Sequence, residues 1–310
     1  MRIGLIDTDF SNRFPNLALM KLSAYHKDKG DLVEWYSPWG ERYDLVYVSK
    51  IYSFTPDYEL AINSEKVIRG GSGYAISLRN GKEIYDKEKD AVLPFEIERI
   101  YPDYSLYPEL TKDTAFGFLT RGCPRGCHFC IVGQKEGYCS VRVAKLSDFW
   151  RGQKNIVLCD PNLLACNEKK ELLLELKETG SYVDFNQGLD ARFMTEELAE
   201  ILSQIKMKEV HFAWDKYREG EVVLAGLKIF KEKTKISQHK LIVYTLVNFD
   251  TTFEQDLERI YTLRELGYWP YVMIYNKKDA EHKYIDLQRW VNMRSTFAVV
   301  EKFEDYKRWK

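Results

Sequence analysis

The sequence carries almost no net charge, because 46 lysines and arginines are matched by 47 aspartates and glutamates among 310 residues. This balance argues against a protein that binds polyanions nonspecifically, but it leaves room for a local basic patch in an enzyme that acts on nucleic acid. No apolar run approaches the roughly 18 residues of a membrane span, and no secretory signal is evident. We therefore expect a cytoplasmic protein with no membrane partner.

Cysteine and histidine are also scarce, at six and five residues. Three of the cysteines lie close together, so the remaining three cannot form the disulfide framework of a small secreted protein. Hydrophobic residues make up 45% of the chain, which is enough to bury a large core. By length alone, about two domains are expected.

The three clustered cysteines lie in the stretch TAFGFLTRGCPRGCHFC, residues 114–130. Residues 115–120 are apolar and rich in aromatics, which predicts a buried strand that leads into a loop. Gly122 and Gly126 allow a tight backbone path in that loop. Its three thiolates can converge on one inorganic centre, and three ligands suit a four-iron cluster with one iron open to a ligand that is not protein.

This CxxxCxxC pattern, with Phe129 directly before the last cysteine, resembles the hallmark of the radical S-adenosylmethionine (SAM) superfamily. The resemblance implies a [4Fe-4S] cluster on Cys123, Cys127 and Cys130, with SAM on the fourth iron and Phe129 among the cofactor-binding residues. It also implies reductive cleavage of SAM to a 5′-deoxyadenosyl radical, which abstracts hydrogen from a substrate that no residue identifies. Such enzymes need an electron donor such as flavodoxin or ferredoxin.

A zinc-stabilised binding module without turnover is an alternative interpretation of the same cysteines. Structural zinc sites usually take four protein ligands from paired CxxC motifs, which this loop does not offer. His128 would be the nearby fourth ligand, but it lies between two of the ligand positions.

The first eighty residues alternate between strand-like and helix-like segments and end in a glycine-rich turn, which predicts a small parallel sheet of Rossmann-like type. In this order the segment resembles the cobalamin-binding-type domain that precedes many radical SAM domains. The expected strands cover residues 1–7, 31–36, 43–51 and 66–68, and the expected helix covers residues 15–29.

One feature of that domain type is missing. Its usual DxHxxG motif does not occur, and the only histidine before the cysteines is His26, within the predicted helix. We therefore expect the domain to serve as a substrate-binding or structural layer and not to bind cobalamin. A cobalamin-dependent radical SAM methyltransferase is the alternative.

Residues 81–113 read as a proline-interrupted linker that wraps the second domain, and residues 114–278 alternate between strands and helices. The expected fold class is α/β, a partial (β/α)6 TIM-like barrel preceded by the small Rossmann-like domain. A C-terminal extension, residues 279–310, would add a helix over 284–291 and then a strand or lid. The expected barrel strands are 115–120, 155–159, 182–185, 209–214, 241–247 and 271–275, and the expected helices are 143–150, 168–179, 195–205, 219–232 and 252–266.

Polar residues follow the ends of these strands, where barrel enzymes place their function. Arg192 could pair with the SAM carboxylate, and Asp190 or Asp215 could accept hydrogen bonds from ribose hydroxyls. A local ion pair between Asp190 and Arg192, and a capping role for Asp160, are the structural alternatives. The candidate SAM-binding residues at the strand ends are Asp160, Asn162, Gln187, Asp190, Arg192 and Asp215.

Two further residues are singled out by position. Cys139 closely follows the cysteine loop and is the candidate catalytic residue, as a hydrogen-atom donor or radical relay. His211 shares one face of its strand with Asp215, so it would contact substrate or SAM if that face lines the barrel, or it would be a satisfied core histidine. Cys159 and Cys166 are expected to be buried packing residues.

Overall fold

The computed structural model describes residues 1–79 and 82–307. The first residue of the expected linker, at position 81, and the last three residues of the C-terminal extension lie outside these ranges. The chain divides into two compact units, Met1–Cys159 and Asp160–Lys310, called here the first and the second unit. The first unit therefore contains the expected Rossmann-like segment, the linker and the start of the expected barrel.

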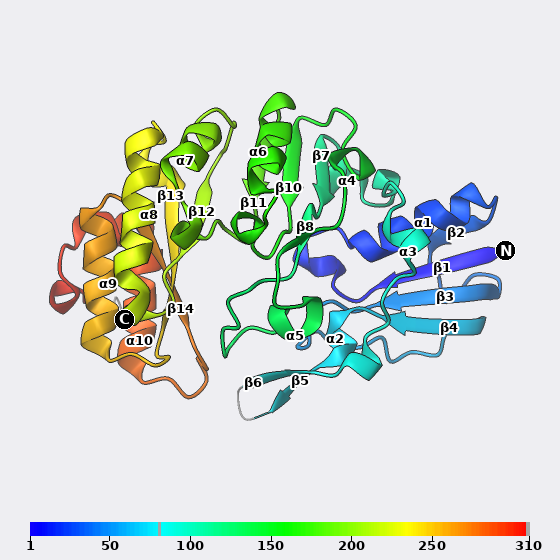
Figure 1. Ribbon diagram of the computed structural model, residues 1–310. Coiled ribbons are helices and arrows are strands. Elements are labelled where there is room, and N and C mark those ends of the chain that lie inside the picture. Colours follow the sequence, from blue (N-terminus) through cyan, green and yellow to red (C-terminus); the bar gives the residue numbers. More distant parts are fainter. Residues whose placement is uncertain (80–81, 308–310) are drawn as a thin grey trace. The chain divides into compact units, whose positions relative to one another are not determined.

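A four-stranded parallel sheet forms the beginning of the first unit, in blue to cyan in Figure 1. The strand order is β2-β1-β3-β4, and each neighbouring pair is parallel. The expected small parallel sheet is thus confirmed. Its strands are β1 (Arg2–Asp7), β2 (Leu32–Trp35), β3 (Tyr43–Ser49) and β4 (Ser64–Gly70).

Helix α1 (Leu17–Asp28) connects β1 to β2, as expected for a parallel crossover. Asn16 caps it by accepting a hydrogen bond from the Leu19 amide at 3.2 Å. Buried residues of α1, among them Leu19 and Met20, pack with Ile3 of β1 in one hydrophobic cluster. This cluster anchors the helix to one face of the sheet.

The residues after β4 carry more structure than a linker. They form α2 (Ser72–Ala75), the antiparallel hairpin β5 (Ile76–Arg79) and β6 (Lys82–Tyr85), α3 (Phe95–Glu98) and α4 (Pro108–Thr111). Ile97 and Tyr107 join the cluster around α1, so this segment packs against the first sheet. The segment packs in this way, and does not act as a plain linker, because apolar residues lie between its prolines.

The expected strand 115–120 is divided into two. β7 (Thr114–Gly117) pairs in parallel with β10 (Asn155–Leu158), whereas β8 (Thr120–Arg121) pairs antiparallel with β9 (Val141–Arg142). The break follows Gly117, where a Cβ would lie 2.3 Å from the Phe149 ring. Close packing at this glycine separates one continuous apolar run into two pairings.

The expected helix over residues 143–150 does not form. Only a 3-10 turn, η4 (Leu146–Asp148), is present, with the Asp148 carboxylate accepting a hydrogen bond from the Lys145 amide at 2.9 Å. Leu146 and Phe149 are buried. One turn, stabilised by a side-chain hydrogen bond, is therefore enough to bury the apolar residues whose spacing suggested a helix.

Strands and helices alternate through the second unit, as expected from the sequence. Strands β12, β13 and β14 form a parallel sheet in that order, and helices α9 and α10 (His282–Asn292) pack on it (Figure 1). The strands are β11 (Tyr182–Phe185), β12 (Val210–Ala213), β13 (Leu241–Val247) and β14 (Trp269–Ile274), and the helices are α6 (Lys169–Glu178), α7 (Glu196–Leu202), α8 (Gly220–Lys233) and α9 (Phe253–Glu265).

The two faces of this sheet differ in composition. On one face, Phe212 of β12 meets Phe230 of α8 with ring centroids 5.0 Å apart, and Val272 packs in the cluster that holds α10. Side chains alternate along a strand, so His211 and Tyr244 lie on the other face. The helices thus cover the apolar face, and a polar and aromatic face is left opposite them.

The C-terminal extension is helical. The expected helix over 284–291 is present as α10 (His282–Asn292), but the following segment forms α11 (Arg294–Val299) and not a strand or lid. Phe297 of α11 is buried against Trp290, with ring centroids 4.9 Å apart. Burial of this aromatic pair outweighs the weak strand preference of the run.

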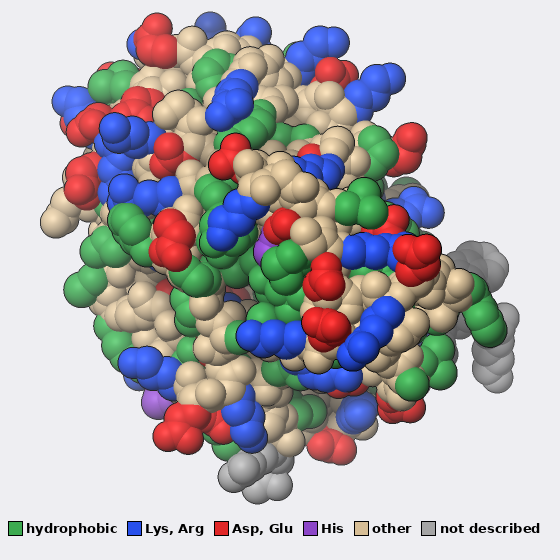
Figure 2. All heavy atoms as spheres, turned by 90° about the vertical axis from the view of Figure 1, so that its right-hand side faces the viewer, with side chains coloured by type: hydrophobic (Ala, Val, Ile, Leu, Met, Phe, Trp, Pro, Cys, Tyr) green, Lys and Arg blue, Asp and Glu red, His purple; other side chains and the backbone are tan. Residues whose placement is uncertain are grey.

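The surface and helix lengths agree with the composition. Basic and acidic side chains are interspersed over the face seen in Figure 2. Among the described residues, no helix combines the length and hydropathy required to cross a bilayer. The molecule is thus a mixed α/β protein built on parallel strands in both units.

Candidate functional site

The three clustered cysteines lie on a loop held at its base by a short antiparallel pair. The loop leaves β8, contains Cys123, Cys127 and Cys130, and continues into α5 (Val132–Glu136) before the chain returns through β9. Thr120 pairs with Arg142 at this base. The strand-then-loop placement that the sequence predicted for the cysteines is therefore confirmed.

Two glycines give the loop its path. Gly122 has φ +84°, and a Cβ on it would lie 2.2 Å from the Cys139 carbonyl oxygen. Gly126 has φ +53° but more space, since the nearest atom to its Cβ would be in the Tyr138 ring at 3.6 Å. Only glycine fits at position 122, because both the dihedral and the close approach exclude a side chain.

Backbone and side-chain bonds fix the loop. The Cys123 amide donates to the Gly137 carbonyl at 3.1 Å, and the Cys130 amide donates to the Cys127 carbonyl at 3.0 Å. Glu136 of α5 accepts from Arg121 at 2.9 Å and from the Gly122 amide at 3.3 Å. The path on which the thiols are presented is thus built into the fold.

The thiols have the chemistry that an iron–sulfur cluster needs. Cys123 and Cys127 are partly exposed, and Cys130 is exposed. Soft thiolates on a glycine-containing loop fit such a cluster, and three of them leave one iron for another ligand. Within residues 1–79 and 82–307, however, no three Cys, His, Asp or Glu side chains are gathered as a metal site, so the ligand set stays a prediction.

The other cysteines differ among themselves. Cys139 is exposed, and its carbonyl lies against the start of the cysteine loop, as its place in the sequence suggested. Cys159 and Cys166 are buried, which agrees with a packing role. The Cys166 thiol donates to Glu168 at 3.1 Å, and burial raises its pKa. Phe129, the other residue predicted on the loop, is half-buried.

The glycine-rich turn after β4 lies beside the cysteine loop. Lys135 of α5 donates a hydrogen bond to the Ser72 hydroxyl, which belongs to this turn. Gly71 has φ +100°, and a Cβ on it would lie 2.3 Å from the Lys50 carbonyl oxygen. The carboxyl end of β4 and the cysteine loop are therefore neighbours, which their sequence separation gave no reason to expect.

The carboxyl ends of β1 and β3 carry an internal hydrogen-bond network. Tyr107 donates to the Asp7 carboxylate at 2.6 Å, and Asn16 donates to Ser49 at 2.8 Å. Asp9 accepts from Thr55 at 2.5 Å. Burial raises the pKa of Asp7, while the bond from Tyr107 opposes that rise. Sequence reasoning missed this network because Tyr107 comes from the segment assigned to a linker.

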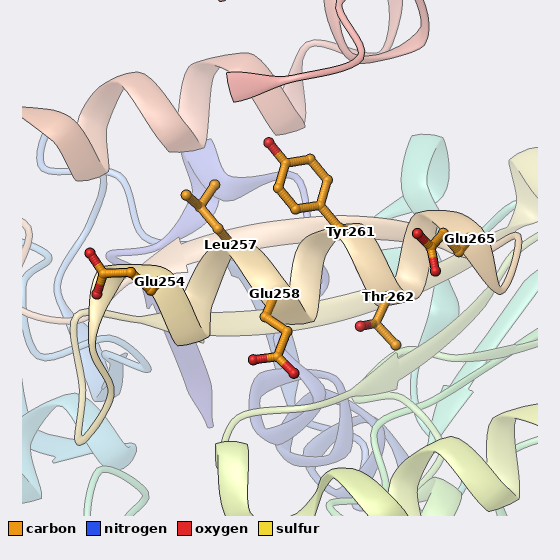
Figure 3. A pocket seen from close by; sticks show the side chains of 6 residues that line it. All are labelled: Glu254, Leu257, Glu258, Tyr261, Thr262 and Glu265. Carbon is orange, nitrogen blue, oxygen red and sulfur yellow. The ribbon is translucent and has the colours of Figure 1, made fainter. Parts of the chain in front are cut away.

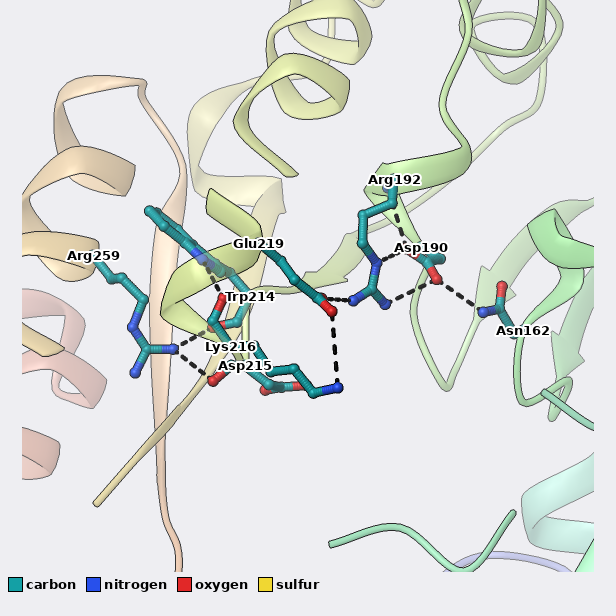
Figure 4. Close-up of polar contacts among 8 residues, drawn as sticks. All are labelled: Asn162, Asp190, Arg192, Trp214, Asp215, Lys216, Glu219 and Arg259. Atoms are coloured by element: carbon teal, nitrogen blue, oxygen red, sulfur yellow. Dashed lines mark hydrogen bonds and ion pairs between the residues drawn. The ribbon is translucent and has the colours of Figure 1, made fainter. Parts of the chain in front are cut away.

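In the second unit, several predicted SAM-binding residues are joined in one polar network (Figure 4). Asn162 donates to Asp190 at 2.9 Å and also caps the 3-10 turn η5 (Leu163–Ala165). Asp160 and Asn162 are buried, whereas Gln187 is exposed. The structure thus brings Asn162, Asp190 and Arg192 together and leaves Gln187 at the surface.

Arg192 is fully engaged by carboxylates of its own chain. Its Nε and Nη2 donate to Asp190 at 2.6 and 2.9 Å, and its Nη1 pairs with Glu219. Burial alone would lower the pKa of Arg192, but these two carboxylates raise it. The alternative of a local ion pair is what the structure shows, and sequence reasoning missed Glu219, which it used only as a helix start.

Asp215 lies at the end of β12, beside a buried arginine. Arg259 of α9 is inaccessible to solvent and donates to the carbonyls of Trp214 at 2.5 Å, Asp215 at 3.1 Å and Leu246 at 2.7 Å. The Asp215 Oδ1 atom is buried without a hydrogen-bond partner. Burial raises the pKa of this carboxyl, and the charge of Arg259 opposes the rise.

A shallow groove along α9 involves none of the predicted site residues. Glu254, Glu258 and Glu265 line it together with Tyr261 (Figure 3). Glu258 accepts a hydrogen bond from Tyr217 at 2.6 Å. The groove is an acidic helix surface and contains none of the thiols or strand-end residues described above.

No known family profile matches the sequence, and no curated protein matches it. The fold, however, is similar to that of the radical S-adenosylmethionine methyltransferase TsrM from Kitasatospora setae, solved with cobalamin and a [4Fe-4S] cluster bound. The TM-score is 0.59 at 12% sequence identity, over 88% of this chain and 74% of that one. The chain therefore shares the overall fold of that protein.

Proposed function

We propose that this chain is a radical SAM enzyme in which Cys123, Cys127 and Cys130 bind a [4Fe-4S] cluster. The observation that carries the proposal is the loop that presents three partly exposed or exposed thiols, in a fold similar to that of an enzyme that holds such a cluster. When bound, the cluster would supply one electron for the reductive cleavage of SAM. A low-potential protein such as flavodoxin or ferredoxin would deliver that electron.

The chain's own residues would hold the loop and position SAM. The Arg121–Glu136 pair and Gly122 keep the thiols on their path. Among the strand-end residues, Asp215 is the best candidate for a ribose hydroxyl, because its Oδ1 lacks a partner. The Arg192 guanidinium would have to exchange a carboxylate partner to receive SAM, so we assign it to loop closure.

Methyl transfer with cobalamin is the leading reaction. The similarity to the cobalamin-containing methyltransferase extends over 88% of the chain, so it includes much of the first unit. The expectation that the first unit does not bind cobalamin is therefore not supported. Glycines at the end of β4, beside the cysteine loop, leave backbone there without large side chains.

Hydrogen abstraction by a 5′-deoxyadenosyl radical, without cobalamin, is the second candidate. The Asp7, Tyr107 and Asn16 network at the carboxyl ends of β1 and β3 favours it, because these polar groups are already paired within the chain. The missing DxHxxG histidine favours it as well. Cys139 would then be the candidate hydrogen-atom donor.

Anaerobic reconstitution with iron, sulfide and cobalamin, followed by dithionite and SAM, tests these proposals in one sample. Retained corrinoid with S-adenosylhomocysteine supports methyl transfer, and 5′-deoxyadenosine without corrinoid supports hydrogen abstraction. Both products should disappear in Cys127→Ala and persist in Cys166→Ala, which removes a thiol outside the loop. Zinc in place of iron, with SAM left intact, would identify a binding module and contradict both reactions.

A further inference from the structure

The face of the second-unit sheet opposite its helices carries a stripe of polar and aromatic side chains. His211 of β12 stacks on Tyr244 of β13, with ring centroids 5.3 Å apart and an interplanar angle of 3°. Tyr271 of β14 meets Tyr244 edge to face at 5.7 Å. Asp184 comes from β11, which contacts β12 but lies outside this sheet, and its carboxyl interacts electrostatically with His211.

Two atoms of these side chains are buried without a hydrogen-bond partner in the described structure, the Asp184 Oδ1 and the His211 Nδ1. Buried polar atoms of folded proteins are nearly always hydrogen-bonded. Leaving either atom unpaired is costly, because it has lost its water without gaining another partner. Two such atoms on side chains that interact with each other therefore indicate a ligand.

The histidine tautomer shows what that ligand must offer. The His211 Nε2 lies 3.8 Å from the Glu209 carboxylate, so a ring proton on Nε2 would face that negative charge and leave Nδ1 as an acceptor. Burial lowers the pKa of His211 against the charges of Asp184 and Glu209, so the neutral ring is favoured. The Asp184 carboxylate is an acceptor too. Both orphaned atoms thus require a donor.

We propose that Asp184 and His211 form a substrate subsite for a nitrogen group with two N–H donors, an amidine or amine, with Tyr244 and Tyr271 beside it as an aromatic wall. A carbonyl or an anion would leave both acceptors unsatisfied. Tyrosine faces also attract cations. Glu209 is paired with Arg294 at 3.4 Å, so Asp184 is the carboxylate available to a cationic group. Lys208 and Arg294 are the cations whose charges reach Asp184 and His211.

This inference names the substrate class for the proposed enzyme and so rests on that function, but its test does not depend on the cluster. The full-length protein without iron or SAM is titrated with benzamidine, benzamide and benzoate, which share one ring and differ in the polar group. Calorimetry gives the affinity, and NMR of the labelled His211 ring gives the location. Benzamidine should bind at least about tenfold more tightly than benzamide, and benzoate should not bind.

Two variants and one control make the test specific. Asp184→Asn and His211→Gln should each remove the preference for benzamidine, and His282→Gln, at an exposed histidine paired with Asp286 at 3.0 Å, should retain it. Circular dichroism establishes whether each variant is folded. If one variant is unfolded, the other still tests the proposal. Equal affinity for the three probes, a preference that survives in either folded variant, or no binding at roughly 10 mM would overturn the proposal. The last result would mean that the two atoms hold only water.

Discussion

Asp190 is the residue on which the polar network of the second unit depends. It accepts hydrogen bonds from the Arg192 side chain, from the Arg192 amide at 3.2 Å and from Asn162. Burial alone would raise the pKa of its carboxyl, but these bonds and the charge of Arg192 together lower it. The network therefore stabilises the ionised carboxylate in the folded protein.

A lowered pKa in the folded state has a defined consequence for acid stability. The contribution of Asp190 should be complete above the pKa of an unfolded aspartate, about 4, and should be lost as the pH falls through the lower folded value. Asp190→Asn should cost about 2 kcal/mol of unfolding free energy at neutral pH, and the gap from the wild type should narrow below about pH 4. Urea unfolding of both proteins across this pH range measures the difference in unfolding free energy.

The matched control is Asp113→Asn, at an exposed aspartate that lies 3.8 Å from Lys154. A surface pair of this kind should change the unfolding free energy by less than about 0.5 kcal/mol at any pH in the range. A constant gap between Asp190→Asn and the wild type down to acid pH would show that the Asp190 carboxylate is not stabilised by its partners.

The cysteine loop offers a comparison of two glycines, which isolates packing from dihedral strain. Gly122→Ala should abolish iron uptake for two reasons. The added Cβ would overlap the Cys139 carbonyl, and alanine would have to adopt the unfavourable φ of +84°. Gly126→Ala has only the unfavourable φ and should cost about 1 kcal/mol while iron uptake persists. Iron content after anaerobic reconstitution distinguishes them. Equal iron loading in the two variants would contradict the tight approach at Gly122.

At the scale of elements, Arg259 of helix α9 ties two strand ends together. Its donors reach carbonyls after β12 and in β13, and it also pairs with buried Asp256. Removing the guanidinium would leave these acceptors and the Asp256 charge buried without it.

Arg259→Met should therefore destabilise the protein by about 3–5 kcal/mol, measured by chemical denaturation. Arg218→Met, at an exposed arginine in the turn before α8, is the control and should change the unfolding free energy by less than about 0.5 kcal/mol. If both variants were equally stable, the strand ends would be held by backbone pairing alone and Arg259 would have no part in positioning Asp215.

The helices that failed to appear, or appeared unexpectedly, share a cause. Residues 143–150 have helical apolar spacing but form only η4, since burying Leu146 and Phe149 requires no further turn. Residues after Met293 have a strand-like run but form α11, because the Phe297 ring packs against the Trp290 ring. In both segments, tertiary packing decided between two local preferences of similar strength.

At the scale of the whole molecule, charge is balanced and dispersed. The net charge is −1, and basic and acidic groups are interspersed on the face shown in Figure 2. A chain with this charge balance has little net charge with which to attract a polyanion.

The protein should therefore pass through a heparin column without retention at roughly 0.1 M salt. A basic protein of similar mass, run as a control, should be retained. Retention that disappears with added salt would instead reveal a local basic patch and would direct the search for substrate toward nucleic acid.

Sequence alone determined the features that depend on short-range order. The cysteine spacing, the glycines of the loop and the alternating apolar segments predicted the thiol loop, the parallel strands and most helices. Strands 182–185 and 241–247 were predicted with their observed bounds. Period-two burial and glycine geometry are local properties, so they can be read from neighbouring residues.

Only the tertiary structure decided how distant polar groups pair. The sequence predicted Arg192 as a ligand-binding residue, but its guanidinium forms an ion pair with Glu219. The sequence placed Tyr107 in a linker, but its hydroxyl donates a hydrogen bond to the Asp7 carboxylate. Asp184 and His211 come from different strands, so only the fold shows that two interacting side chains each carry a polar atom without a partner. Such pairings depend on strand order and register, which long-range packing sets and local sequence does not encode.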